Sequence, residues 1–89
     1  MLKVRTSKKF EKDYKRCQKR GKDTDKILAV MRRLIKEQPL DTKYQDHPLT
    51  GIFKDSRDCH IETDWILIYR VSGDEIFFER TGTHSDLFK

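Results

Sequence analysis

The chain has 89 residues, of which 35% are hydrophobic and 39% are charged, and its formal net charge is +5. A chain of this length is expected to form one domain, residues 1–89, with a thin hydrophobic core. No apolar run approaches the roughly 20 residues that a membrane-spanning helix needs, and the N-terminal residues lack the apolar segment of a signal peptide. We therefore expect a cytoplasmic protein that does not enter membranes.

The charge is unevenly distributed along the chain. Residues 1–38 contain 14 Lys or Arg against 5 Asp or Glu, whereas residues 39–89 contain 6 against 10. A strongly basic half favours a polyanionic partner, with nucleic acid ahead of membrane, although a solvated basic surface gives the same composition. Cys17 and Cys59 form no Cys-x-x-Cys motif, so we expect two free thiols in a reducing compartment and no structural metal site.

The first 21 residues predict an edge strand followed by a basic helix. Residues 2–6 alternate in polarity, and Ser7 can cap the helix that follows. Over residues 8–20 the apolar side chains share one narrow face, and Gly21 is suited to a helix end. The apolar positions are Phe10, Tyr14 and Cys17, and the opposite face holds Lys8, Lys9, Lys12, Lys15, Arg16, Lys19 and Arg20. This basic face is either a phosphate-binding ridge or a solvated helix back.

A second helix is predicted from Asp23 or Thr24, either of which can cap it, to a stop before Pro39. Its apolar residues form a wide face that we expect to be core: Ile27, Leu28, Val30, Met31, Leu34 and Ile35. Residues 39–56 contain both prolines and indicate a long ordered loop, with a short turn or strand near residues 52–54. Long loops in compact domains are often functional.

The remaining residues predict strands over 57–61, 65–71 and 76–80, with a hairpin turn at 72–75 and a turn and short tail after residue 80. The middle strand is almost continuously apolar, as a central strand should be. The order of elements predicts an α+β fold: a small antiparallel β-sheet with two N-terminal helices packed on one face.

Polar residues suited to acid–base chemistry gather around these strands. Successive strand residues point to opposite faces, so if Cys59 faces the helices, Asp58 and His60 face away. By the same alternation, Arg80 is expected to continue the face of Phe78. Near one end of the sheet we expect a convergence of His60, Asp64, Arg80 and His84, with His47 folding over them from the long loop.

Histidines, a carboxylate and an arginine, without a nucleophilic serine or a metal motif, suit RNA cleavage by its own 2′-hydroxyl. One imidazole removes the 2′-OH proton, another protonates the leaving 5′-oxygen, and arginine stabilises the phosphate charge. Trp65 or Phe88 can stack on a base. Each residue also has a structural alternative, such as a turn cap, an ion pair or, for Trp65, the core. A histidine–aspartate metal site is a further alternative, but the spacing fits no zinc signature.

Three motifs stand out in the second half of the chain: YQDHPLTG, RDCHIETDWILIYR and FERTGTHSDLF. Together they resemble the YafQ branch of the RelE/ParE toxin superfamily, and the resemblance extends over nearly the whole chain in element order. It implies a RelE-like fold and the toxin of a toxin–antitoxin pair, monomeric when free and held by a cognate antitoxin in a hetero-oligomer. It further implies an endoribonuclease without metal or cofactor that cuts mRNA in the ribosomal A site, leaving a 2′,3′-cyclic phosphate and a 5′-hydroxyl.

The resemblance also implies roles for individual residues. Proton transfer and positioning fall to His47, His60, Asp64 and His84, phosphate charge to Arg80, and stacking on mRNA to Trp65 and Phe88. It leaves open which histidine is base and which is acid. The basic helix would dock on ribosomal RNA or receive an acidic antitoxin segment, with Lys8, Lys12, Lys15 and Lys19 as candidate contacts. Departures from the family pattern at Phe53, Cys59 and Thr63 leave the codon preference open.

Two other classes of function compete with the nuclease hypothesis. The ParE branch shares the fold and inhibits a protein target, DNA gyrase, without catalysis. A plain nucleic-acid-binding module would depend on the basic helix and be indifferent to the histidines. The histidine–aspartate group favours the nuclease, because a protein that only binds has no reason to assemble it.

Overall fold

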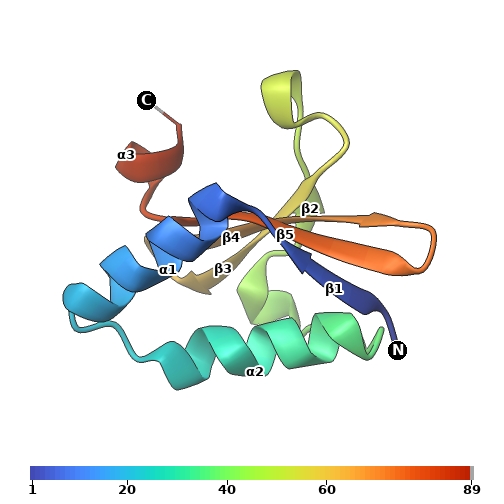
Figure 1. The fold of residues 1–89 in the computed structure, drawn as a ribbon, viewed down its shortest axis with the longest axis horizontal. Helices are drawn as coiled ribbons and strands as arrows, with labels where there is room; N and C mark the ends of the chain where they lie inside the picture. The colour runs from blue at the N-terminus through green and yellow to red at the C-terminus, as the bar shows by residue number, and fades with distance from the viewer. Residues whose placement is uncertain (89) are drawn as a thin grey trace.

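A five-stranded sheet with two long helices on one face forms the framework of the protein (Figure 1). The computed structural model describes residues 1–88. The strand order is β1-β5-β4-β3-β2. In chain order the elements are β1 (Lys3–Thr6), α1 (Lys8–Lys19), α2 (Thr24–Ile35), the 3-10 turn η1 (Thr42–Tyr44), β2 (His47–Pro48), the 3-10 turn η2 (Gly51–Phe53), β3 (Arg57–Glu62), β4 (Trp65–Ser72), β5 (Glu75–Gly82) and α3 (His84–Leu87). Among residues 1–88, no helix is long and apolar enough to cross a membrane.

Both long helices begin where capping residues were predicted. The hydroxyl of Ser7 accepts the N–H of Phe10 at 2.9 Å at the start of α1, and Asp23 caps α2. Gly21 ends α1 with a left-handed backbone, φ +82°. Helix α2 stops before Pro39 because Glu37 is already left-handed, with φ +58°. The residue that ends α2 is therefore not the proline.

The sheet confirms the predicted fold class and refines its strand directions. β2, β3, β4 and β5 pair antiparallel, whereas β1 pairs parallel with β5 over Lys3–Thr6 and Glu75–Phe78. A four-residue edge strand contains no sequence signal for its direction. Its end is fixed by Ser7, whose hydroxyl donates to the carbonyl of Glu79 at 2.8 Å, so α1 starts beside β5.

Apolar side chains fill both faces of the central strand β4. Trp65, Leu67 and Tyr69 pack under the helices, and Ile66 and Ile68 pack on the other face. The second face is covered by Leu49, Phe53 and Leu87. Helix α3, which supplies Leu87, lies in the segment that was predicted to be a turn and tail.

One residue of the predicted α2 core lies outside it. Leu28 is 38% exposed, whereas Ile27 and Val30 are buried against the sheet. Leu28 follows Ile27 by about 100° around the helix, which turns it away from the sheet. The expectation that Leu28 belongs to the core is therefore wrong.

A bulge in β5 changes the face on which Arg80 lies. Ile68 pairs with Arg80 while Tyr69 pairs with Phe78, so Glu79 is an extra residue. The bulge places Arg80 in register with Ile68, on the face opposite the helices. The expectation that Arg80 continues the face of Phe78 is wrong, because strict alternation ends at Glu79.

Candidate functional site

Three histidine rings gather on the sheet face opposite α1 and α2. His47 comes from β2, His60 from β3 and His84 from the first position of α3. The ring centroids are 6.3 Å apart for His47 and His60, and 5.6 Å apart for His60 and His84. The sheet sets this arrangement, because β2 pairs with β3 so that His47 lies opposite Asp58, two residues before His60. The predicted convergence of the three histidines is therefore present.

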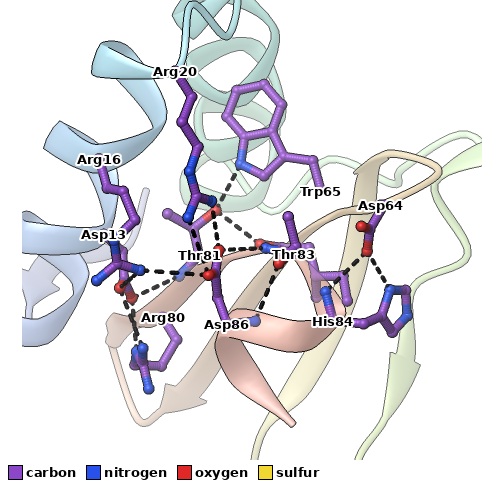
Figure 2. A network of polar contacts seen from close by, with 11 residues as sticks. Asp13, Arg16, Arg20, Asp64, Trp65, Arg80, Thr81, Thr83, His84 and Asp86 are labelled. Carbon is purple, nitrogen blue, oxygen red and sulfur yellow. Dashed lines mark hydrogen bonds and ion pairs between the residues drawn. The ribbon is translucent and has the colours of Figure 1, made fainter. Parts of the chain in front are cut away.

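Asp64 fixes the ring of His84. The Oδ1 atom of Asp64, in the turn between β3 and β4, accepts the backbone N–H of His84 at 2.9 Å and lies 2.6 Å from the ring Nδ1 (Figure 2). These contacts with His84, the backbone one first, lower the pKa of Asp64. Nδ1 donates to the carboxylate, so Nε2 of His84 is left without a partner among residues 1–88. This nitrogen can accept or deliver a proton.

A second histidine–carboxylate pair lies at the other side of the cluster. Nε2 of His47 is 3.0 Å from Oδ1 of Asp58, a contact within ion-pair distance that lacks hydrogen-bond geometry. Nδ1 of His47 lies 2.6 Å from the carbonyl oxygen of Gln45. Burial raises the pKa of Asp58, while the neighbouring histidines oppose this shift. Nδ1 of His47 thus has a hydrogen-bond partner, whereas Nε2 only lies at ion-pair distance from a carboxylate.

The half-buried His60 stands between these two pairs. Within residues 1–88 its ring makes no hydrogen bond, so both nitrogens are available to a ligand. It also lines a cavity of about 720 Å³ between α2 and η1, whose other walls include Lys43, Tyr44 and Glu62. Among residues 1–88, both ring nitrogens of His60 and the Nε2 atom of His84 are therefore free for proton transfer.

Phe88 borders the histidine cluster. Its ring is 6.2 Å from that of His84 and meets Phe53 edge-on at 5.9 Å, measured between centroids. Phe88 is 41% exposed, so a base can reach it. The structure therefore places this predicted residue beside the site.

Trp65 does not join the cluster. It is 1% exposed in the core under the helices, where its indole N–H donates to Oγ1 of Thr81 at 3.0 Å. The apolar run that it begins alternates between two buried faces, and Trp65 falls on the helix side. Its proposed stacking on mRNA has no exposed surface to act through, and its role in this structure is packing.

Arg80 makes no hydrogen bond or ion pair with Asp64 or the three histidines among residues 1–88, and pairs instead with Asp13. Figure 2 shows it turned toward Asp13 of α1, across the network from Asp64 and His84. Its Nε donates to Oδ2 of Asp13 at 2.7 Å, and a second guanidinium nitrogen donates to Oδ1 at 3.2 Å. These contacts raise the pKa of Arg80. The structure therefore brings Asp64 and the three histidines together, whereas the guanidinium of Arg80 pairs with Asp13.

Sequence reasoning missed the two buried carboxylates near the site, Asp13 and Asp58. Asp13 is 1% exposed and also accepts the backbone N–H of Thr81. Each had a signal in the sequence: Asp13 lies three residues after Phe10 on the apolar face of α1, and Asp58 shares the face of His60.

The predicted lysines of α1 are exposed, and no carboxylate within residues 1–88 pairs with any of Lys8, Lys12, Lys15 and Lys19.

Comparison with known proteins places the chain in a family. The family model described as "Bacterial toxin of type II toxin-antitoxin system, YafQ" matches residues 2–89. The mRNA interferase toxin YafQ of Escherichia coli strain K12 is 48% identical over 86 residues, which cover 96% of this chain and 94% of that protein.

Solved structures agree with this match. A crystal structure of the E. coli DinJ–YafQ complex is similar over 100% of both chains, with 46% identity and a TM-score of 0.93. A metal-bound toxin from Helicobacter pylori is 46% identical, with a TM-score of 0.92 over 99% of this chain and 100% of that one. In residues 1–88 of this chain, no group of three His, Cys, Asp or Glu is arranged to hold a metal ion.

Fold and site together define a small α+β toxin of a type II toxin–antitoxin system. The chain belongs to the YafQ family. The resemblance seen in its three motifs is thereby confirmed.

Proposed function

We propose that the protein is a ribosome-dependent endoribonuclease that cleaves mRNA in the A site by attack of a 2′-hydroxyl on the adjacent phosphate. The observation that carries this is the pair of neighbouring imidazoles with free nitrogens, His60 and His84, one of them oriented by Asp64. The E. coli relative bears the name mRNA interferase toxin, which supports the same chemistry.

The two histidines divide the proton transfers. A neutral imidazole takes the 2′-OH proton as the 2′-oxygen bonds to phosphorus. A protonated imidazole donates to the 5′-oxygen as the bond from phosphorus to that oxygen breaks. The products are a 2′,3′-cyclic phosphate and a 5′-hydroxyl, and solvent restores both protonation states. Asp64 keeps the ring of His84 in the required orientation, as a carboxylate does for a catalytic histidine.

Other residues would position the RNA. Phe88 offers an exposed ring for stacking on a base next to His84. Arg80 shares the sheet face of the cluster, and Nη1 of its guanidinium has no partner within residues 1–88. While Asp13 holds the other nitrogens, this one can donate to an RNA phosphate.

The partners follow from the surface charge of α1 and from the family. We propose that its exposed lysines bind ribosomal RNA phosphates, because lysine side chains bind phosphate without reading sequence. We further propose a cognate antitoxin that neutralises the toxin in a hetero-oligomer, as the E. coli relative occurs in complex with DinJ. The free toxin is then a cytoplasmic monomer.

Primer extension on mRNA from briefly induced cells tests the proposal. We expect new 5′ ends clustered within codons, reduced about 10²-fold or more in His60→Ala and His84→Ala, the scale for losing an acid or base. Asp55→Ala, an exposed substitution outside the cluster, is the control and should cleave normally. Growth arrest without new 5′ ends would indicate a non-catalytic inhibitor of the ParE kind instead.

A further inference from the structure

We propose that Arg20 is a positioning residue for cleavage: its ion pair with Asp86 fixes the orientation of α3 and thereby places His84 in the histidine cluster. The effect on cleavage rests on the proposed nuclease function. The contact between α1 and α3 is a property of the free protein, and its strength can be measured without RNA.

A forked ion pair joins α1 to α3. Nη1 of Arg20 donates to Oδ2 of Asp86 at 2.7 Å, and Nη2 donates to Oδ1 at 3.2 Å (Figure 2). Two parallel hydrogen bonds between a guanidinium and a carboxylate fix the relative orientation of the groups as well as attracting them. The side chain of Asp86 is 15% exposed, so solvent screens this pair less than it screens an ion pair in open water.

The carboxylate of Asp86 is also tied to the end of β5. Its Oδ2 atom accepts the backbone N–H of Thr83 at 3.0 Å, and the hydroxyl of Thr83 accepts the backbone N–H of Asp86 at 3.1 Å, which forms a capping box. Gly82 leaves the space that this carboxylate occupies, because a Cβ atom there would lie 2.8 Å from Oδ2 of Asp86. Asp86 is therefore the point at which Arg20, β5 and α3 meet.

Helix α3 needs contacts of this kind to keep its orientation. It has four residues, and helices this short are not stable by themselves. Leu87 packs on the sheet, but apolar contacts are not directional. The contact of His84 with Asp64 joins two side chains that are more than half exposed, and such pairs contribute little. The ion pair of Arg20 with Asp86 is therefore the more shielded of the two polar contacts that orient α3.

Helix α1 gives Arg20 a fixed support. The buried Asp13 joins this helix to β5 through the guanidinium of Arg80 and the backbone N–H of Thr81. One turn earlier, Phe10 packs in the core under the helices. Arg20 therefore connects α3, and with it His84, to a helix whose own position is set by the core.

The same contact separates Arg20 from the lysines of α1, with which the sequence had grouped it on one basic face. Among residues 1–88, those lysines have no carboxylate partner, whereas Arg20 pairs with Asp86. Loss of the lysines should weaken binding to the ribosome. Loss of Arg20 should instead slow the reaction on ribosomes that are already bound.

Amide hydrogen exchange on the full chain tests the contact with α3. The reporters are three backbone N–H groups: that of His84, which donates to Asp64, and those of Leu87 and Phe88, which close the helix. In Arg20→Ala we expect these amides to exchange about tenfold faster or more, because α3 opens locally. Unchanged exchange in this variant, or unprotected α3 amides in the unsubstituted chain, would overturn the proposal.

The central strand β4 and an arginine outside the network provide the controls. Amides of β4 should keep their exchange rates in Arg20→Ala. Arg33→Ala removes an exposed arginine from α2 and should change neither set of amides. Equal acceleration of α3 and β4 amides in Arg20→Ala would show a general loss of stability rather than a local hold on α3, and would refute the positioning role.

Single-turnover cleavage on ribosomes programmed with mRNA separates positioning from docking. With ribosomes in excess, Arg20→Ala should lower the maximum rate about tenfold, since small displacements of a catalytic group are costly. The ribosome concentration that gives the half-maximal rate should not change. A higher half-maximal concentration with an unchanged maximum rate would make Arg20 a phosphate contact of α1 and would overturn the proposal.

Conservative and partner substitutions identify the contact responsible. Arg20→Lys retains a positive charge opposite Asp86 and should recover part of the lost rate. Asp86→Asn should lower the maximum rate, and adding Arg20→Ala to it should cost little more, because both substitutions remove the same contact. Fully additive losses would show that the two side chains act independently and would refute the role. Absence of cleavage by the unsubstituted chain would refute the nuclease function while leaving the hydrogen-exchange result standing.

Discussion

Nε of Arg80 donates to Oδ2 of the buried Asp13 at 2.7 Å, which ties the last strand of the sheet to the first helix. Asp13→Ala would leave the guanidinium without its partner and the N–H of Thr81 without an acceptor. Breaking one side of a buried pair is strongly destabilising, so we expect the free energy of unfolding to fall by about 3 kcal/mol. Urea unfolding followed by circular dichroism measures this change.

The control for this substitution is an exposed ion pair. Asp74 lies 3.3 Å from Lys3, and both side chains are 73% exposed. Because exposed pairs contribute little, Asp74→Ala should leave the urea midpoint almost unchanged. Similar midpoints for Asp13→Ala and Asp74→Ala would show that the Asp13 contacts add nothing to stability.

Asp86 gives the protein a stability that depends on pH. The Arg20 guanidinium, at 2.7 Å, and the backbone N–H of Thr83 hold the pKa of Asp86 well below its usual range. The folded state therefore favours the ionised carboxylate, and this contribution is fully present above the ordinary aspartate pKa of about 3.9. It is lost as the pH falls through that value toward the lower pKa of the folded state.

We expect Arg20→Ala to make stability less sensitive to acid. Urea midpoints measured from neutral pH down to about pH 2 should fall less steeply in this variant than in the unsubstituted chain. Arg33→Ala removes an exposed arginine from α2 and should follow the unsubstituted curve. Parallel curves for all three proteins would contradict a role for Arg20.

Trp65, the only tryptophan, reports directly on whether the indole contacts RNA. Because it is 1% exposed, its fluorescence should be that of a buried indole and resist quenching by iodide. Adding an RNA oligonucleotide should leave the emission unchanged, since stacking needs an exposed ring. Strong quenching by RNA, with no loss of folded structure, would restore Trp65 to the substrate surface.

The lysines of α1 should control ribosome binding without affecting chemistry. Replacing Lys8, Lys12, Lys15 and Lys19 with alanine should weaken ribosome association and flatten its dependence on salt, because fewer counterions are released. The control replaces three exposed basic residues at the end of α2, Arg32, Arg33 and Lys36, and so removes one positive charge fewer. If both variants lose binding equally, net charge rather than the α1 face directs association.

Local patterns in the sequence predicted most of the fold. Ser7, Asp23 and Gly21 act through contacts with residues close in sequence, so their roles as caps and stops were readable directly. The direction of β1 and the bulge at Glu79 depend on residues far apart in the chain, and no local pattern encodes them. Helix α3 was missed because four residues are too few for a helical period to be recognised.

The site was predictable to the extent that strand alternation governs it. Alternation placed His60 and Asp58 on one face, and the motifs supplied His47 and His84. It failed for Arg80, where a bulge changes the register. The pairing of carboxylates with basic side chains depends on distances between residues far apart in the sequence. The ion pair of Arg80 with Asp13 was therefore not predictable from the sequence.

The parallel pairing of β1 with β5 also has a consequence for synthesis on the ribosome. β1 is the first strand to leave the exit tunnel, but it cannot pair until β5, the last strand, has been made. Val4 of β1 pairs with Ile76 of β5, and β1 neighbours no other strand in the sheet. Such long-range pairing delays folding until late in translation. Moreover, His84 and Phe88 follow β5. A nascent chain that ends before β5 leaves β1 without its partner strand, and one that ends before His84 still lacks a histidine of the cluster. A ribosome making this protein is therefore not exposed to an assembled site on its own unfinished product.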